Sequence, residues 1–256
     1  ARGLADGGLL KPLQWKFMEE HAFTGYDNDA NMVKIAILNL YLHQLEKAHI
    51  ELHNPLTTTR GGQYPGQLFD IILANPPFAG KIQSESILAD IGLETRDTEL
   101  LFLKWFIDHL SNGGRAGVIV PNGVLFGSSK ADKKVRELLM TTCDLQAVIA
   151  LPSGVFKPYS GVGTAIFVFE KGRPTESVWF YEITADGYSL DDKRIPNQAN
   201  NDIPDIIAKW PSREEGRNSF RVPINRIREN GWQLMVGRYK PLRLEATQYE
   251  PPEKIL

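Results

Sequence analysis

A short apolar run that stops abruptly at two prolines constrains the fold of this chain more than any other feature. The run from Ile71 to Ala74 has no polar alternation, which predicts a β-strand covered on both faces. It is followed directly by Asn75, Pro76, Pro77 and Phe78. Each proline removes a backbone N–H and fixes φ at about −65°. The sequence therefore predicts a stiff loop that carries free carbonyls, one side-chain amide and one aromatic ring.

Such a loop suits a flat base that bears an exocyclic amino group. The N6 amine of adenine is a poor nucleophile because its lone pair is delocalised into the ring. The side-chain oxygen of Asn75 and the carbonyl of Pro76 could each accept one N–H, and Phe78 could stack on the base. The alternative is an ordinary turn in which the prolines only end the strand and Phe78 belongs to the core. The preceding apolar strand and the following Gly-containing loop favour the functional interpretation.

Strand-like segments alternate with helical patterns along the chain. Predicted strands span residues 22–27, 49–52, 68–74, 116–120, 145–151, 164–170 and 177–183, and predicted helices span 28–45, 98–110 and 130–140. This alternation predicts an α/β fold with a doubly wound, mostly parallel sheet. Ligands of such sheets bind at the carboxyl ends of the strands. Asp27, Asn54 and Asn75 all lie at predicted ends of this kind.

Several of these residues have two interpretations. Asp27 follows a strand and precedes a helix, so its carboxylate either accepts hydrogen bonds from both hydroxyls of a ribose or caps the helix. Asn54 either contacts an adenine edge or forms a plain Asn-Pro turn. Phe156, in the loop after the strand over 145–151, either faces a target base or packs its own loop. Arg194 is interpreted as a solvated surface residue, with contact to a partner as the alternative.

Composition limits the classes of protein that remain. The 256 residues carry a formal net charge of −2, so a stand-alone nucleic-acid binder is disfavoured unless another subunit makes most phosphate contacts. The single cysteine, Cys143, excludes an internal disulfide and fits a reducing cytosol, so a cytoplasmic protein is expected. No zinc-type Cys/His spacing occurs, and no metal site is predicted. No run of roughly 18 apolar residues occurs, so no membrane span is predicted.

Several segments together resemble a known family. Asn75-Pro76-Pro77-Phe78 resembles the catalytic tetrapeptide of amino-group DNA methyltransferases. More specifically, the chain resembles the modification (M) subunit of type I restriction-modification systems. That resemblance is carried by residues 23–27, 113–126, 151–156 and 179–190, of which the last segment is the most specific to this subunit. It extends from about residue 22 to about residue 240.

The resemblance implies transfer of a methyl group from S-adenosylmethionine to N6 of an adenine flipped out of duplex DNA. The implied catalytic residues are Asn75, Pro76, Pro77 and Phe78, the implied cofactor-binding residues are Asp27 and Asn54, and the implied contact to the base is Phe156. The implied partners are DNA, a specificity (S) subunit, a restriction (R) subunit and a second M subunit. An S subunit that chooses the DNA sequence agrees with the lack of a basic excess.

The chain departs from the family pattern at two places. The family carries a first strand and a glycine-rich cofactor loop upstream of the acidic strand end, whereas only a short stretch precedes Phe23 here and Gly7-Gly8 matches the loop poorly. The family also usually has an acid where this chain has Asn54. We therefore expect a gap between the strand ending at Asp27 and the strand leading to Asn75, or a strand supplied from outside this sequence. Residues 1–256 by themselves are expected to bind S-adenosylmethionine weakly or not at all.

The domain division and two competing functions complete the expectations. Residues 1–186 are predicted to form an N-terminally truncated catalytic domain, and residues 187–256 a polar, partner-contacting extension. Residues 79–96 are polar and contain two glycines, which predicts a mobile loop with few contacts.

One alternative function is a methylase of RNA bases or protein glutamine, which present a similar planar amine; residues 179–190 argue against it. The other alternative is a non-catalytic, methylase-like scaffold.

Overall fold

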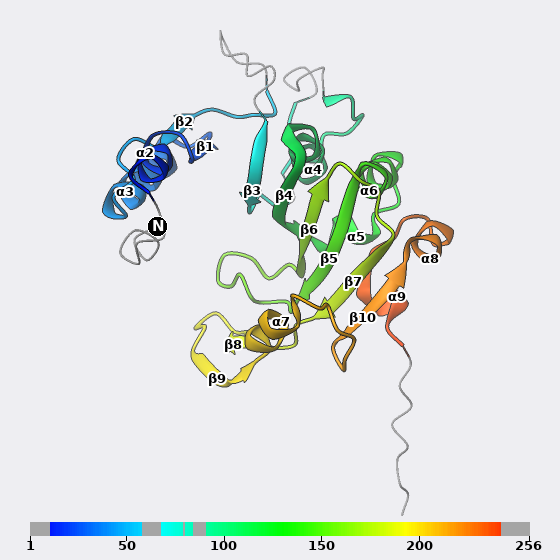
Figure 1. Ribbon diagram of the computed structural model, residues 1–256. Helices are drawn as coiled ribbons and strands as arrows, with labels where there is room; N and C mark the ends of the chain where they lie inside the picture. Colours follow the sequence, from blue (N-terminus) through cyan, green and yellow to red (C-terminus); the bar gives the residue numbers. More distant parts are fainter. Residues whose placement is uncertain (1–10, 58–67, 79, 84–90, 242–256) are drawn as a thin grey trace, which may run out of the picture. The chain divides into compact units, whose positions relative to one another are not determined.

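The computed structural model describes residues 11–57, 68–78, 80–83 and 91–241 (Figure 1). The chain divides into two compact units. Unit 1 comprises residues 1–65 and 83–92, and unit 2 comprises residues 66–82 and 93–256.

Unit 1 is built on two parallel strands. Along the chain it contains α2 (Pro12–Glu20), β1 (Thr24–Asp27), α3 (Ala30–Leu42) and β2 (His49–Leu52). β1 and β2 are parallel, and Asp27 at the end of β1 is opposite Leu52 at the end of β2. Both predicted strands and the predicted helix between them are confirmed, whereas α2 was not predicted.

Unit 2 contains a six-stranded sheet in the order β10-β7-β5-β6-β4-β3 (Figure 1). Its strands are β3 (Phe69–Ala74), β4 (Leu110–Pro121), β5 (Cys143–Leu151), β6 (Thr164–Lys171), β7 (Ser177–Glu182) and β10 (Ser219–Pro223). β3 is parallel to β4 and β5 is parallel to β7. β6 is antiparallel to both β4 and β5, and β10 is antiparallel to β7. Four of the six strands thus run in one direction, which confirms the predicted α/β class with a mixed, mostly parallel sheet.

Helices pack against this sheet at several places. They are α4 (Thr98–His109), α5 (Asn122–Phe126), α6 (Lys130–Thr142), α7 (Ile203–Lys209), α8 (Ile224–Glu229) and α9 (Val236–Tyr239). α4 contacts β4, α6 contacts β5, and the two helices contact each other. Ser129 and Asp132 form a capping box at the start of α6, and Val135 and Leu139 give the helix a fully buried apolar stripe.

The part of the chain after residue 187 contributes to the sheet and its core. It supplies β10 and α7, and Ile206 of α7 packs in a buried cluster with Ile149 and Tyr181. It also contains β9 (Pro196–Asn201), which pairs antiparallel with β8 (Asp186–Tyr188) to form a hairpin. That this part of the chain contacts a partner stays a prediction.

The prediction that β3 is covered on both faces is wrong. Ile72 is buried, but Ile71 is 61% exposed and Leu73 is 82% exposed, because β3 is the edge strand and packs through one face. β1 pairs with β2 within unit 1, and β3 pairs with β4 within unit 2. The expected gap between the strand ending at Asp27 and β3 stays a prediction.

The predicted mobile loop over residues 79–96 lies partly outside the described residues, at residue 79 and residues 84–90. Its described ends are held in place. The backbone N–H of Ile82 donates to the carbonyl of Arg96 at 3.0 Å, and Ile91 and Leu93 are buried. The prediction of few contacts is therefore wrong for these ends.

Across the described ranges, no helix has the length and apolar character that a membrane crossing requires. The same residues contain no group of three or more His, Cys, Asp or Glu side chains placed to hold a metal ion.

Candidate functional site

The four residues after β3 form a rigid loop at the carboxyl end of this strand. β3 ends at Ala74, which is paired with Val118 of β4. Pro76 is buried, whereas Asn75 on one side of it is exposed. Pro77 is also exposed, and Phe78 is half-buried. The loop therefore anchors itself through one proline and turns its amide side chain outward.

The exit of this loop is fixed against the start of α4. The carbonyl of Gly80 accepts a hydrogen bond from the backbone N–H of Thr98 at 3.0 Å. A Cβ atom added to Gly80 would lie only 2.5 Å from the Oγ1 of Thr98. The absence of a side chain at Gly80 permits this close approach of the backbone to the helix. Both ends of the loop that carries Asn75 are thus tied to regular structure.

Phe156, which lies in the connection between β5 and β6, contacts Phe78 of this loop. β6 begins at Thr164, which is paired with Pro121 at the end of β4 and with Leu151 at the end of β5. This connection therefore leaves and rejoins the sheet at the carboxyl ends of β4 and β5. The ring centroids of Phe78 and Phe156 lie 5.7 Å apart with an interplanar angle of 69°, an edge-to-face arrangement.

Two hydrogen-bond acceptors accompany this aromatic pair. They are the side-chain oxygen of Asn75 and the carbonyl of Pro76, which are contributed by neighbouring residues. Within the described ranges, neither acceptor receives a hydrogen bond. Asn75 is exposed, so its side-chain oxygen is open to an N–H donor of a ligand, whereas the carbonyl of Pro76 belongs to a buried residue and is an unused acceptor.

Asp27 lies at the last position of β1, and the structure decides one of its two interpretations. The helix cap of α3 is Asp29, whose carboxylate accepts the backbone N–H of Asn31 at 2.7 Å. The helix-cap interpretation of Asp27 is therefore wrong. Oδ1 of Asp27 accepts the N–H of Asp29 at 2.8 Å, which leaves Oδ2 as a further acceptor at the strand end.

Asn54 lies beside Asp27 at the same end of the parallel pair. The N–H of His53 donates to the carbonyl of Asp27 at 2.9 Å. This hydrogen bond links the segment after β2 to the end of β1. Oδ1 of Asn54 accepts the N–H of Leu56 at 3.0 Å, the arrangement of a plain Asx turn. Asp27 and Asn54 belong to unit 1, and the other candidate residues belong to unit 2.

Arg194 is placed differently from the prediction of a solvated side chain. Its guanidinium forms an ion pair with Asp186, and the side chain of Asp186 is 9% exposed. The sequence signal for this pair is an acid at the start of a short strand and a cation that follows a polar turn. Gly154 was also missed as a separate residue, although the run Pro152-Ser153-Gly154 indicates a turn. Its φ of +97° lies in the left-handed region that favours glycine.

Comparison with known proteins gives consistent relatives. The N-6 DNA Methylase family model matches residues 12–246. The methylase subunit of the type I restriction enzyme EcoEI from Escherichia coli is 33% identical over 224 residues, which cover 84% of this chain and 45% of the relative. The crystal structure of a modification subunit from Vibrio vulnificus YJ016 has a TM-score of 0.76 at 26% identity, and the match covers 94% of this chain and 52% of that chain. The EcoKI M protein has a TM-score of 0.66 at 25% identity, and the match covers 78% of this chain and 43% of that chain.

The fold is that of the modification subunits of type I restriction enzymes that the chain matches. The chain belongs to the N-6 DNA Methylase family, because the family model matches most of its length. It spans about half the length of the relatives that it matches.

Proposed function

We propose that this chain is the catalytic part of an M subunit that transfers a methyl group to N6 of adenine in duplex DNA. The observation that carries the proposal is the contact of Phe156 with Phe78, whose loop also carries two acceptors that receive no hydrogen bond from the described residues, Asn75 Oδ1 and the Pro76 carbonyl. A flipped adenine presents a flat ring and an amine with two N–H groups, and these features match the two aromatic faces and the two acceptors.

The proposed chemistry needs orientation of the amine more than a strong base. Asn75 and Pro76 accept the two N–H groups of the amine, which turns its lone pair out of conjugation with the ring. Phe78 and Phe156 hold the ring by stacking and edge contacts. S-adenosylmethionine, when bound, would supply an electrophilic methyl group: its S–CH3 bond would break as the N–C bond forms, S-adenosylhomocysteine would leave, and the amine would lose one proton to solvent. Rate acceleration then comes from positioning and from oriented dipoles.

Asp27 is the residue that we propose for holding the cofactor's ribose. Its carboxylate lies at the carboxyl end of β1 and keeps Oδ2 as an acceptor, which fits the two hydroxyls of a ribose. Asn54 has its oxygen in an Asx turn, so its amide nitrogen is the group that can donate to an adenine ring nitrogen.

The proposed partners follow from the relatives, which are methylase subunits of type I restriction enzymes. We propose that DNA, an S subunit, an R subunit and a second M subunit assemble with the full-length protein. The formal net charge of −2 agrees with an arrangement in which another subunit supplies most phosphate contacts.

The function is tested by methyl transfer from radiolabelled S-adenosylmethionine, with full-length protein and its S subunit. Unmethylated genomic DNA should be labelled as N6-methyladenine. Labelling of RNA or of protein glutamine instead would support the other methylase functions. Binding of S-adenosylmethionine without labelling of any of these substrates would support a non-catalytic scaffold.

The role of Asp27 predicts a loss of cofactor affinity. Asp27→Ala in the full-length protein should raise the Kd for S-adenosylmethionine by about tenfold to a hundredfold, the cost of hydrogen bonds to a charged group. Isothermal titration measures the change. Asp29→Ser is the matched control, since it also removes a carboxylate but keeps a good helix cap for α3. Equal Kd values for both variants and the wild type would contradict the assignment.

The stacking role of Phe78 predicts a graded loss of activity. Phe78→Ala should lower the methylation rate by about tenfold to a hundredfold, because stacking on a base contributes ~1–3 kcal/mol. Phe78→Trp should retain much of the activity, since it keeps an aromatic face. Rates are measured in single turnover on unmethylated DNA. An alanine variant as active as the tryptophan variant would show that Phe78 only fills space.

A further inference from the structure

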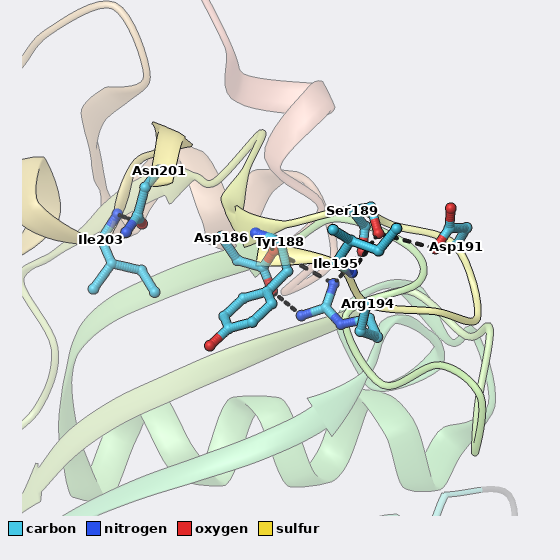
Figure 2. A network of polar contacts seen from close by, with 8 residues as sticks. All are labelled: Asp186, Tyr188, Ser189, Asp191, Arg194, Ile195, Asn201 and Ile203. Atoms are coloured by element: carbon cyan, nitrogen blue, oxygen red, sulfur yellow. Dashed lines mark hydrogen bonds and ion pairs between the residues drawn. The ribbon is translucent and has the colours of Figure 1, made fainter. Parts of the chain in front are cut away.

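The hairpin of β8 and β9 is closed by a nearly buried ion pair (Figure 2). The guanidinium of Arg194 faces both carboxylate oxygens of Asp186 and forms a two-pronged contact. It also donates to the carbonyl of Ser189 at 2.9 Å and lies 5.2 Å from the ring centroid of Tyr188. Because a bidentate Arg–carboxylate pair fixes the orientation of both partners, the two ends of the hairpin turn are held together.

The turn between the two strands has its own hydrogen bonds. The hydroxyl of Ser189 donates to Oδ1 of Asp191 at 2.9 Å and accepts the N–H of Ile195 at 2.8 Å. The same Asp191 oxygen accepts the N–H of Lys193 at 3.0 Å. Figure 2 shows these side chains converging on the turn. The turn therefore keeps one shape and can serve as a firm surface for a neighbouring segment.

The base of the hairpin is attached to the main sheet. Oδ2 of Asp202 accepts the N–H of Thr184 at 2.7 Å and the N–H of Ala185 at 3.1 Å. Asp202 directly precedes α7, and Ile206 of that helix packs in the core beside Ile149 of β5. The hairpin thus belongs to the same rigid part of unit 2 as the sheet.

The turn of the hairpin contacts the loop that carries Phe156 at two points. The backbone of Gly154 lies against the hairpin so closely that an added Cβ would be 2.5 Å from the carbonyl oxygen of Leu190. Three residues further on, Nζ of Lys157 lies 3.4 Å from Oδ1 of Asp192. These two contacts lie on either side of Phe156 in the sequence, so the hairpin supports the loop at the place where the ring projects.

We propose that this hairpin holds Phe156 against Phe78, and that Gly154 and Arg194 are positioning residues for the aromatic pair. The inference rests on the proposed function, in which the two rings hold the target base. Gly154 permits the close contact, and Arg194 gives the hairpin the shape that the contact needs. A misplacement of ~1 Å in such a support can lower a rate by on the order of 100-fold.

Gly154→Ala in the full-length protein is the first test. The added methyl group meets the Leu190 carbonyl, and alanine is strained at a φ of +97°, so the loop should move off the hairpin. Hydrogen exchange of residues 152–163 should accelerate, and methylation should fall by about tenfold to a hundredfold. Gly161→Ala in the same loop is the matched control, because its Cβ meets nothing within 4 Å. It should leave both readouts unchanged.

Two further sets of variants test the hairpin itself. Arg194→Gln should accelerate exchange in the same loop although the contacts of Arg194 described above are all within the hairpin, and Arg194→Lys should restore part of the protection. Lys157→Asp should lower the methylation rate by at most about fivefold, as expected for an exposed ion pair. Combining it with Asp192→Lys should restore the rate. The changes at Lys157 and Asp192 alter exposed side chains and leave the core intact.

The outcomes separate this inference from the proposed function. Faster exchange and slower methylation in Gly154→Ala and Arg194→Gln, with neither change in Gly161→Ala, would support the inference. Loop exchange that is equal in Gly154→Ala and Gly161→Ala would overturn it, and so would a loosened loop with wild-type methylation. If the wild-type assembly methylates no DNA, the proposed function fails, whereas the exchange comparison still decides whether the hairpin holds the loop.

Discussion

Asn75→Ala is expected to lower the rate of methyl transfer by at least about 10²-fold while DNA binding stays nearly unchanged. Removal of one oriented hydrogen-bonding group at a reacting centre typically costs roughly 10²–10³ in kcat. Asn75 is exposed at the end of β3, and its oxygen receives no hydrogen bond from the described residues, so its loss should leave the fold intact. Single-turnover methylation and a DNA-binding titration separate the two effects.

The matched control for this experiment is Asn225→Ala. Asn225 is an exposed asparagine on the short helix α8, far in sequence from the loop after β3. The control should retain the wild-type rate, and both variants should show wild-type thermal unfolding. Normal methylation by Asn75→Ala would remove its catalytic assignment. A parallel loss of DNA binding would show that Asn75 contributes to affinity more than to the transition state.

Local signals were sufficient for the parts of the fold that depend on few neighbours. The end of β3 was predicted from an apolar run stopped by Pro76 and Pro77, and it lies at Ala74 as expected. The strand leading to Asp27 and the helix after it were also predicted within a few residues. These signals are periodicity and proline geometry, which act within a few residues along the chain.

Features that depend on distant partners could not be predicted from the same signals. The apolar run of β3 indicated burial on both faces, but Leu73 is exposed because β3 is an edge strand. The contact between Phe78 and Phe156 depends on the antiparallel insertion of β6 between β4 and β5. The hairpin over residues 186–201 was missed because β9 is polar and almost wholly exposed, so its pairing relies on Arg194 rather than on apolar alternation.

Arg136 was missed for a similar reason, although it lies at the centre of a large network. This residue on α6 has a relative exposure of 0%, yet its guanidinium donates to three backbone carbonyls. The distances from the guanidinium nitrogens to the carbonyl oxygens are 2.7 Å for Trp232, 2.8 Å for Val124 and 2.7 Å for Gly127. Burial lowers the pKa of Arg136 from its ordinary value, and the hydrogen bonds compensate for part of that desolvation. One side chain therefore joins α6, α5 and the segment after α8.

Arg136→Met is accordingly expected to destabilise unit 2 strongly. The substitution keeps a long apolar stem but leaves three carbonyl groups without this donor, at ~1–3 kcal/mol for each buried group. A loss of at least about 3 kcal/mol corresponds to a drop in Tm of about 6–12 °C for a domain of this size. Arg136→Lys should recover only part of the loss, since an ammonium group cannot span the three acceptors as a planar guanidinium does.

Urea unfolding followed by fluorescence measures the free energy of unfolding of these variants. Lys133→Met is the matched control, because it removes a cation from the same helix at an exposed position and should change stability by less than about 0.5 kcal/mol. If Arg136→Met unfolds at the same urea concentration as the control, the three carbonyls find other donors, and Arg136 does not hold α5 and the segment after α8 in place. Strong destabilisation of Arg136→Met alone would show that these elements depend on one buried cation.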